Sequence, residues 1–277
     1  MTGDIRLPAF TQAGLATLKT TNELTRSLAR PLYWLYEKKL YEQVAAARKP
    51  QHLGLILDGN RRFARAMGMN EQRGYEHGVR KVHEVLHWCV DLGIPHVTVY
   101  VLSTENFRRS SGEVSFLLDL FVKKSREFSR PDVAVKVIGR RHMLPEEVLE
   151  TVRTLEAEPV EEPRLKLNIA LAYGGREEIV DAVRGLIHEA GEKGDSLSRV
   201  ADQLTPGQIA QHLYTSGLPD PDFIIRTSGE QRLSGFCLWQ AAYSEYYFCE
   251  AFWPAFRRVD FLRAIRNYQQ RKRRYGR

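Results

Sequence analysis

The 277-residue sequence has few cysteines and no long apolar segment. Its three cysteines, Cys89, Cys237 and Cys249, form no CxxC pair, which argues against a disulfide framework or a zinc site and favours buried thiols in a reducing compartment. No run of about 18 apolar residues occurs, and the N-terminus lacks the basic and apolar regions of a signal peptide. We therefore expect a soluble cytoplasmic protein.

Excess charge is also missing from most of the chain. The formal net charge is +7, but residues 257–277 carry +8, which leaves −1 on residues 1–256. A nearly neutral body argues against a diffuse nucleic-acid-binding surface, because contact with a polyanion requires many cations. We therefore expect no nucleic acid among the partners, and a nucleic-acid binder that uses only the basic tail is disfavoured.

Several motifs that identify other enzyme classes are absent. The chain has no Walker A GxxxxGK[ST], no GxGxxG after its first expected strand, no HExxH and no GxSxG. His83 and His87 have the four-residue spacing of metal ligands, but no third ligand accompanies them, so packing or surface positions are favoured. These absences argue against P-loop, dinucleotide-binding, zinc-protease and serine-hydrolase chemistry.

Six segments rich in Val, Ile, Leu and Tyr alternate with helical patterns. Strands are expected at residues 52–57, 96–102, 133–138, 165–171, 222–226 and 245–249. Helices are expected at residues 75–91, 114–122, 176–190 and 206–214. Such alternation predicts one α/β domain over residues 50–277, with a mainly parallel six-stranded sheet flanked by helices.

Residues 1–49 are expected to form an N-terminal helical extension. The helical pattern covers residues 12–48 with a break at Pro31. Packing of one face on the α/β domain is the favoured interpretation, and peripheral contact with a membrane or a partner protein is the alternative. The residues of that face are Tyr33, Tyr36, Leu40, Tyr41 and Val44.

Polar side chains gather after the expected strands, where parallel α/β sheets bind ligands. Residues 58–62 (DGNRR) follow the first strand, residues 103–109 (STENFRR) follow the second, and Arg226, Arg232 and Ser234 follow the fifth. A carboxylate beside arginines suits a phosphate group held together with Mg²⁺. A capped turn with solvated arginines is the alternative for each motif taken alone.

Two separate arginine sets predict two phosphorylated ligands, or one very long ligand. A diphosphate carries about three negative charges, and one charge pair at about 4 Å is worth roughly 4 kcal/mol before desolvation at an effective dielectric constant of about 20. Several cations are therefore needed to hold one diphosphate or to let it leave. So many arginines exceed the need of a simple ester hydrolase.

A resemblance to a known family rests on the motifs DGNRRFAR, STENFRR, NIALAYGGREEIVDAV, DFIIRTSGEQRLSGFCLWQAAYSEYYF and RRYG. In this order they resemble the cis-prenyltransferases, the undecaprenyl diphosphate synthase-like enzymes, over residues 50–276. The segments PLYWLYEKKL, LYTSGLPDPDFIIRTSGEQRLSGF and PAFRRVDFLRAIRNY look closest to the actinobacterial short-chain branch, the Z,E-farnesyl diphosphate synthases.

The resemblance implies a parallel α/β fold that encloses an apolar tunnel, and a role for each matching residue. Asp58 would be the catalytic carboxylate and would bind Mg²⁺ together with Glu245, while Asn106 would assist proton removal. Val101 stands where smaller residues keep the tunnel open in long-chain members, so it should limit product length. Substrate contacts are implied for Gly59, Asn60, Arg61, Arg62, Phe63, Ser103, Thr104, Glu105, Phe107, Arg109, Arg226, Arg232, Leu233, Ser234, Arg274 and Gly276.

The implied substrates are isopentenyl diphosphate and a short allylic diphosphate, with geranyl diphosphate as the expected primer and (2Z,6E)-farnesyl diphosphate as the expected product. The implied assembly is a homodimer in which residues 274–276 reach the partner's site. The chain departs from long-chain members at Phe63, which replaces a tryptophan, and at Glu71 and Tyr75, which replace an arginine and a histidine. A decaprenyl or undecaprenyl diphosphate synthase and a non-catalytic scaffold subunit are the alternatives.

Overall fold

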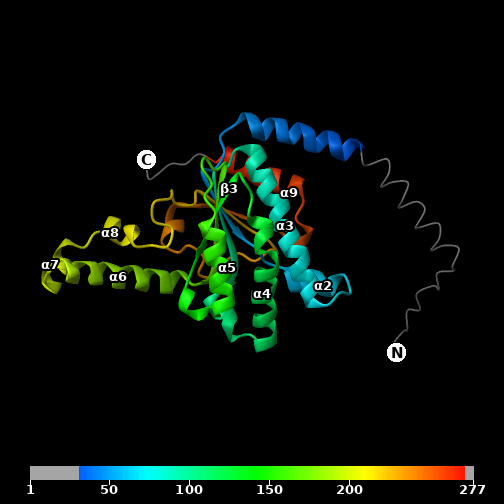
Figure 1. Ribbon diagram of the computed structural model, residues 1–277. Helices are drawn as coiled ribbons and strands as arrows, with labels where there is room; N and C mark the ends of the chain where they lie inside the picture. The colour runs from blue at the N-terminus through cyan, green and yellow to red at the C-terminus, as the bar shows by residue number, and fades with distance from the viewer. Residues whose placement is uncertain (1–30, 272–277) are drawn as a thin grey trace, which may run out of the picture.

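The computed structural model describes residues 31–271, and the predictions for residues 12–30 and 274–276 lie outside this range (Figure 1). Within it, six strands form one sheet in which every pairing is parallel. The order is β3 (Val133–Ile138), β4 (Leu165–Tyr173), β2 (His96–Ser103), β1 (His52–Ile56), β5 (Phe223–Arg226) and β6 (Glu245–Phe248). The predicted parallel six-stranded sheet is confirmed.

The helices in the described range are α2 (Asn60–Ala66), α3 (Glu71–Leu92), α4 (Ser111–Lys124), α5 (Glu146–Ala157), α6 (Gly175–Glu192), α7 (Leu197–Gln203), α8 (Pro206–Gln211) and α9 (Arg258–Gln270), with a further helix over residues 31–46. In Figure 1, α3, α4 and α5 lie along the sheet, whereas α6, α7 and α8 extend to one side as an arm. The helices therefore divide into a layer on the sheet and a projecting group.

Local sequence signals account for several helix ends. The Asn70 side chain accepts a hydrogen bond from the Arg73 N–H and starts α3, and Gly93 ends it in the left-handed conformation. Ser110 caps α4 by accepting from the Glu113 N–H. The Glu113 carboxylate does not return to Ser110, because it bonds to groups in the candidate site described below.

The two faces of β1 show why this segment forms a buried strand. Leu53 and Leu55 pack into the larger core between the sheet and α3, α4, α5 and α9, and each is fully buried. Ile56 faces the opposite side, where a smaller core contains Phe236. Burial of each such side chain contributes about 1.5–3 kcal/mol, so apolar residues are required on both faces of this central strand.

The helix over residues 31–46 packs on the domain through Leu40 and Val44, which are 1% and 0% exposed. Gln269 of α9 donates hydrogen bonds to the carbonyl oxygens of Val44 and Arg48, each at 2.9 Å. Of the predicted face, Leu40 and Val44 therefore pack on the domain, whereas Tyr33 and Tyr36 are 40% and 37% exposed. No helix within residues 31–271 combines the length and apolar character that crossing a membrane requires.

Candidate active site

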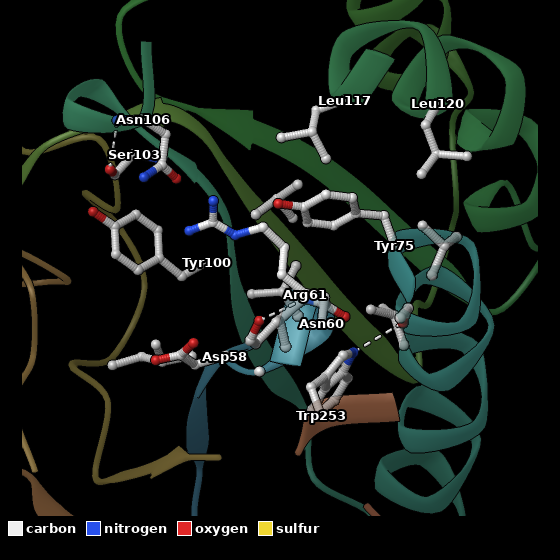
Figure 2. A pocket seen from close by; sticks show the side chains of 18 of the residues that line it. Asp58, Asn60, Arg61, Tyr75, Tyr100, Ser103, Asn106, Leu117, Leu120 and Trp253 are labelled. Atoms are coloured by element: carbon white, nitrogen blue, oxygen red, sulfur yellow. Dashed lines mark hydrogen bonds between the residues drawn. The ribbon is translucent and has the colours of Figure 1, made fainter. Parts of the chain in front are cut away.

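A cavity of about 680 Å³ opens at the carboxyl edge of the sheet, beyond β1, β2 and β5. Small-molecule sites commonly have volumes of about 300–1,000 Å³. Figure 2 shows Leu117 and Leu120 across the cavity from Asp58, so a polar half faces an apolar half. The continuous tunnel implied by the resemblance stays a prediction. The apolar half is lined by Val79, Val82, Leu117, Leu120, Phe121 and Phe128.

Asp58 lies in the polar half between two arginines. Its Oδ2 accepts a hydrogen bond from Arg226 Nη2 at 2.7 Å, and its Oδ1 accepts one from Arg62 Nη2 at 3.3 Å. Burial would raise the pKa of Asp58, but the hydrogen bond and charge of Arg226 and the charge of Arg62 outweigh burial and hold the pKa below its ordinary value. Asp58 is therefore an anion at neutral pH and can bind a cation.

The turn after Asp58 requires glycine. Gly59 has φ of 105°, in the left-handed region that other residues rarely adopt. A Cβ at this position would lie 2.9 Å from the ring of Phe252 and 3.0 Å from Cβ of Ser228. The chain can therefore reverse direction beside the loop that follows β5 only because residue 59 has no side chain.

Arg226 and Ser234 of the second arginine set are in contact. Arg226 Nη1 donates to Ser234 Oγ at 2.9 Å and to the carbonyl oxygen of Arg232. The Arg226 side chain is 4% exposed, and its Nε has no acceptor among the described residues. A buried donor without an acceptor is uncommon and is frequently found at functional sites.

A glutamate absent from our predictions connects the two arginine sets. Glu230 lies in the loop after β5, and its Oε1 pairs with Arg62 Nη1 at 3.1 Å. Its Oε2 pairs with Arg232 Nη1. The only signal in the sequence was the position of Glu230 between Arg226 and Arg232. That position is equally compatible with an acid paired to an arginine and with an acid exposed to solvent.

Another glutamate holds the remaining cavity arginines. Glu113 Oε1 accepts from Arg109 Nη1 at 2.9 Å and from the Tyr75 hydroxyl at 2.6 Å, and its Oε2 lies 3.6 Å from Arg61 Nη1. Burial, reinforced by the hydrogen bond to Glu113, raises the pKa of Tyr75, so the hydroxyl stays a neutral donor. Tyr75 therefore occupies the cavity wall, whereas Glu71, the other departure from long-chain members, pairs with Arg65 at 2.6 Å.

The Asn106 side chain is fixed by a reciprocal cap at the end of β2. Ser103 Oγ accepts from the Asn106 N–H at 3.2 Å, and Asn106 Oδ1 accepts from the Ser103 N–H at 3.2 Å (Figure 2). This pair begins the short 3-10 helix Thr104–Arg108. The cap holds the predicted proton-removal residue at the cavity wall.

The structure brings most predicted site residues together around the cavity. The residues that line it are Asp58, Gly59, Asn60, Arg61, Arg62, Val101, Ser103, Asn106, Arg109, Arg226, Arg232 and Ser234. The predicted contacts that do not line it are Phe63, Thr104, Glu105, Phe107 and Leu233. Phe63 packs against His77 with ring centroids 5.8 Å apart, and Leu233 packs on the smaller core.

Glu245 lies away from the cavity within one chain. It is the first residue of β6 and pairs in register with Phe223, three residues before Arg226 on a parallel strand. With about 3.3 Å per residue, Glu245 lies about 10 Å back from the carboxyl end of the sheet, and its carboxylate pairs with Arg271 at 2.6 Å. The binding of a metal by Glu245 therefore stays a prediction.

Asp58 is compatible with a magnesium site in which substrate and water provide most of the ligands. No group of three or more His, Cys, Asp or Glu side chains within residues 31–271 could hold a metal ion. Mg²⁺, however, is commonly bound by one or two carboxylates, with water and substrate phosphate oxygens as the other ligands. The ionised Asp58, in a cavity whose arginines can bind phosphate, fits that pattern. The side chains of residues 31–271 do not provide a metal site made of protein ligands alone.

Comparisons with known proteins bear on the family of the chain. A family model described as "Putative undecaprenyl diphosphate synthase" matches residues 56–276. An isoprenyl transferase of Thermus thermophilus is 54% identical over 91% of this chain and 98% of its own length. A (2Z,6E)-farnesyl diphosphate synthase of Thermobifida fusca is 47% identical over 89% and 97%.

A solved structure supports the same assignment. Lavandulyl diphosphate synthase from Lavandula x intermedia, in complex with dimethylallyl diphosphate, superimposes with a TM-score of 0.76 and 34% identity, over 83% of this chain and 99% of that chain. Since the family model and the relatives cover most of the chain, the protein belongs to the undecaprenyl diphosphate synthase-like family of prenyltransferases.

Proposed function

We propose that the cavity joins isopentenyl diphosphate to geranyl diphosphate and releases (2Z,6E)-farnesyl diphosphate. The observation that carries this proposal is the presence of two arginine sets at the polar half of a cavity whose other half is apolar. Each diphosphate needs cations, and each prenyl chain needs an apolar wall. The chain-length assignment draws further support from the Thermobifida fusca relative.

The first arginine set is proposed to hold the allylic diphosphate. Arg61, Arg62 and Arg109 provide guanidinium groups near Asp58, and Mg²⁺ bound by Asp58 would neutralise charge on the departing diphosphate. The bond between the allylic carbon and oxygen breaks, and its electron pair leaves with the diphosphate. Arg61 and Arg109 meet that developing charge from positions that Glu113 already orders.

The second set is proposed to hold isopentenyl diphosphate through Arg226, Arg232 and Ser234. The double bond of this substrate supplies the electron pair for the new carbon–carbon bond, and a proton then leaves the adjacent carbon. Asn106 is proposed to position the acceptor of that proton, because its side chain is fixed at the cavity wall by the cap with Ser103. A Z double bond results from the face at which the proton is lost.

Replacing Val101 with alanine is expected to lengthen the product. Val101 lines the cavity at an irregularity in the pairing of β2 with β4, and alanine would remove two methyl groups from the wall. Val160→Ala is the matched control, because Val160 lies in the loop after α5, outside the cavity lining. Chromatography of dephosphorylated products measures chain length, and an unchanged distribution in the Val101 variant would contradict the proposed role.

A long-chain polyprenyl diphosphate synthase is the second candidate, favoured by the description of the matching family model. Incubation with Mg²⁺, labelled isopentenyl diphosphate and either geranyl or farnesyl diphosphate separates the two. Farnesyl-length product from the geranyl primer supports the proposal, whereas polyprenyl product contradicts it. Absence of product with every primer would instead support a scaffold subunit.

We also propose that the enzyme is a homodimer. Large apolar side chains stay exposed on α6, α7 and the segment around β6, which is typical of an association surface. They are Val180, Ile187, Leu197, Tyr243 and Phe248. Sedimentation velocity is expected to give twice the monomer mass, and a monomer at micromolar concentration would contradict this assembly.

A peripheral membrane contact is proposed only for the helix over residues 31–46. Leu32, Trp34 and Leu35 are 71%, 60% and 54% exposed, and Lys38 lies on the same helix. An apolar group beside lysine is compatible with the surface of an anionic bilayer. Co-sedimentation with anionic vesicles tests this contact, with neutral vesicles as the control.

A further inference from the structure

Two glutamates each bridge a pair of cavity arginines. Glu113 is bonded to Arg109 and lies 3.6 Å from Arg61, and Glu230 pairs with Arg62 and Arg232. Every guanidinium group of these two pairs is therefore already next to a carboxylate before any diphosphate arrives. A ligand anion has to share these arginines with the glutamates or displace them.

The two glutamates differ in how firmly they are held. Glu113 stands in the first turn of α4, its side chain is 17% exposed, and it accepts an additional hydrogen bond from Tyr75. Glu230 stands in a loop, its side chain is 29% exposed, and within the described range the arginines are its only side-chain partners. Glu113 is therefore held by the neutral Tyr75 hydroxyl as well as by arginines, whereas Glu230 is held by the two charged arginines alone.

Glu230 also connects the two proposed diphosphate sites. Arg62 approaches Asp58 in the first set, and Arg232 belongs to the second set, where its side chain is 61% exposed. A diphosphate brings about three negative charges against the single charge of a carboxylate, so it wins the competition for either arginine. Once Arg62 or Arg232 binds a diphosphate in place of Glu230, Glu230 has lost one of its two partners and is held less firmly.

We infer that Glu230 is a built-in counter-ion that occupies Arg62 and Arg232 in the free enzyme, is displaced by substrate diphosphate, and returns when inorganic diphosphate leaves. This inference rests on the proposed function of the cavity. Glu230 is a positioning residue, since it acts through the arginines. Its effect is to lower the affinity of the site for free diphosphate and so to favour release after the prenyl chain has been transferred.

Titration calorimetry of the full chain with inorganic diphosphate tests the inference. Glu230→Gln keeps the shape of the side chain but removes the competing charge, so it is expected to bind inorganic diphosphate about tenfold more tightly and to be inhibited by it at about tenfold lower concentration. Glu113→Gln is expected to bind no more tightly than the wild type, because Glu113 orders its arginines rather than competing for them.

Glu146→Gln is the matched control. Glu146 pairs with Arg153 at 2.7 Å on the exposed face of α5, outside the cavity lining, so its variant should match the wild type. Glu230→Ala provides a second variant with the same expected direction, and thermal unfolding verifies that each variant is folded. Equal or weaker diphosphate binding in both Glu230 variants overturns the inference. A wild-type chain that binds diphosphate but forms no prenyl product overturns the proposed function instead.

Discussion

Replacing Asp58 with asparagine is expected to lower kcat/KM for prenyl transfer by about 10²–10³-fold, the range found when one group that stabilises transition-state charge is removed. Asparagine has nearly the same shape, so it preserves the turn at Gly59. It cannot, however, provide the charge that would hold Mg²⁺ or balance the buried Arg226, which donates to Asp58 at 2.7 Å. The loss should therefore appear mainly in kcat.

The chain offers a close control for this variant. Asp195 pairs with Arg199 at 2.8 Å, with the same four-residue spacing as Asp58 and Arg62, but on the surface beside α7. Asp195→Asn should retain wild-type kinetics. Steady-state assays with both diphosphates, together with thermal unfolding of each variant, provide the measurement. If Asp58→Asn kept its rate within about tenfold of the wild type, the central role of this carboxylate would be excluded.

Replacing Glu178 with alanine is expected to lower the free energy of unfolding by about 3–5 kcal/mol, a large share of the stability of one domain. Glu178 on α6 is fully buried. Its carboxylate accepts from the Tyr173 hydroxyl, from Gln240 Nε2 at 3.0 Å and from the Tyr214 N–H at 2.9 Å. Alanine would remove the acceptor of the Tyr173 hydroxyl and of the Tyr214 N–H, and would leave Gln240 Nε2 with Thr215 Oγ1 as its remaining acceptor.

The loss of the Glu178 hydrogen bonds should also disturb the active site. The Tyr173 hydroxyl accepts from the Cys237 N–H at 3.2 Å, so the Glu178 network supports the segment that follows Ser234. Urea unfolding measures the stability change, and Glu192→Ala, an exposed residue of the same helix, should change stability by less than about 0.5 kcal/mol. A Glu178→Ala variant as stable as the Glu192 control would contradict the importance of the buried network.

The same carboxylate predicts a pH effect of defined sign. Burial raises the pKa of Glu178 above its ordinary value of 4.5, and its hydrogen bonds oppose that shift only in part. Because the folded pKa exceeds the unfolded pKa, the contribution of this group is fully present below the unfolded pKa and is lost as pH rises through the folded pKa. The stability of wild type relative to Glu178→Gln, measured by urea unfolding, should therefore fall as pH rises above the ordinary glutamate pKa of 4.5.

Much of the fold was accessible from the sequence because the central strands are buried on both faces. Runs such as residues 52–57 contain mainly apolar side chains, and such runs predict parallel strands. The first residues of helices were harder to predict from the sequence. α3 begins at Glu71 rather than at residue 75, because its first turn after the Asn70 cap is polar and shows no apolar periodicity.

The site residues that could be predicted from the sequence are those that directly follow an expected strand. Asp58 and Arg226 were predicted because residues after parallel strands meet at one edge. The same rule does not cover Glu245, since a residue that begins its strand lies toward the opposite edge, and its predicted role with the metal rests on the resemblance alone. The roles of Glu113 and Glu230 depend on tertiary pairing between distant segments, and no local pattern specifies which arginine an acidic side chain will meet.

The different anchoring of the cavity arginines has a consequence for the entropy of binding. Ordering a long side chain at an interface costs about 0.5–1.5 kcal/mol. Arg61 and Arg109 are already ordered by Glu113, so this cost is incurred when the protein folds. Arg232, with a side chain that is 61% exposed, is held by Glu230 alone among the described residues and has to exchange that partner for its ligand, so its ordering cost falls on the binding step. The allylic diphosphate should therefore meet a rigid receptor, and isopentenyl diphosphate should bind with the larger entropic penalty.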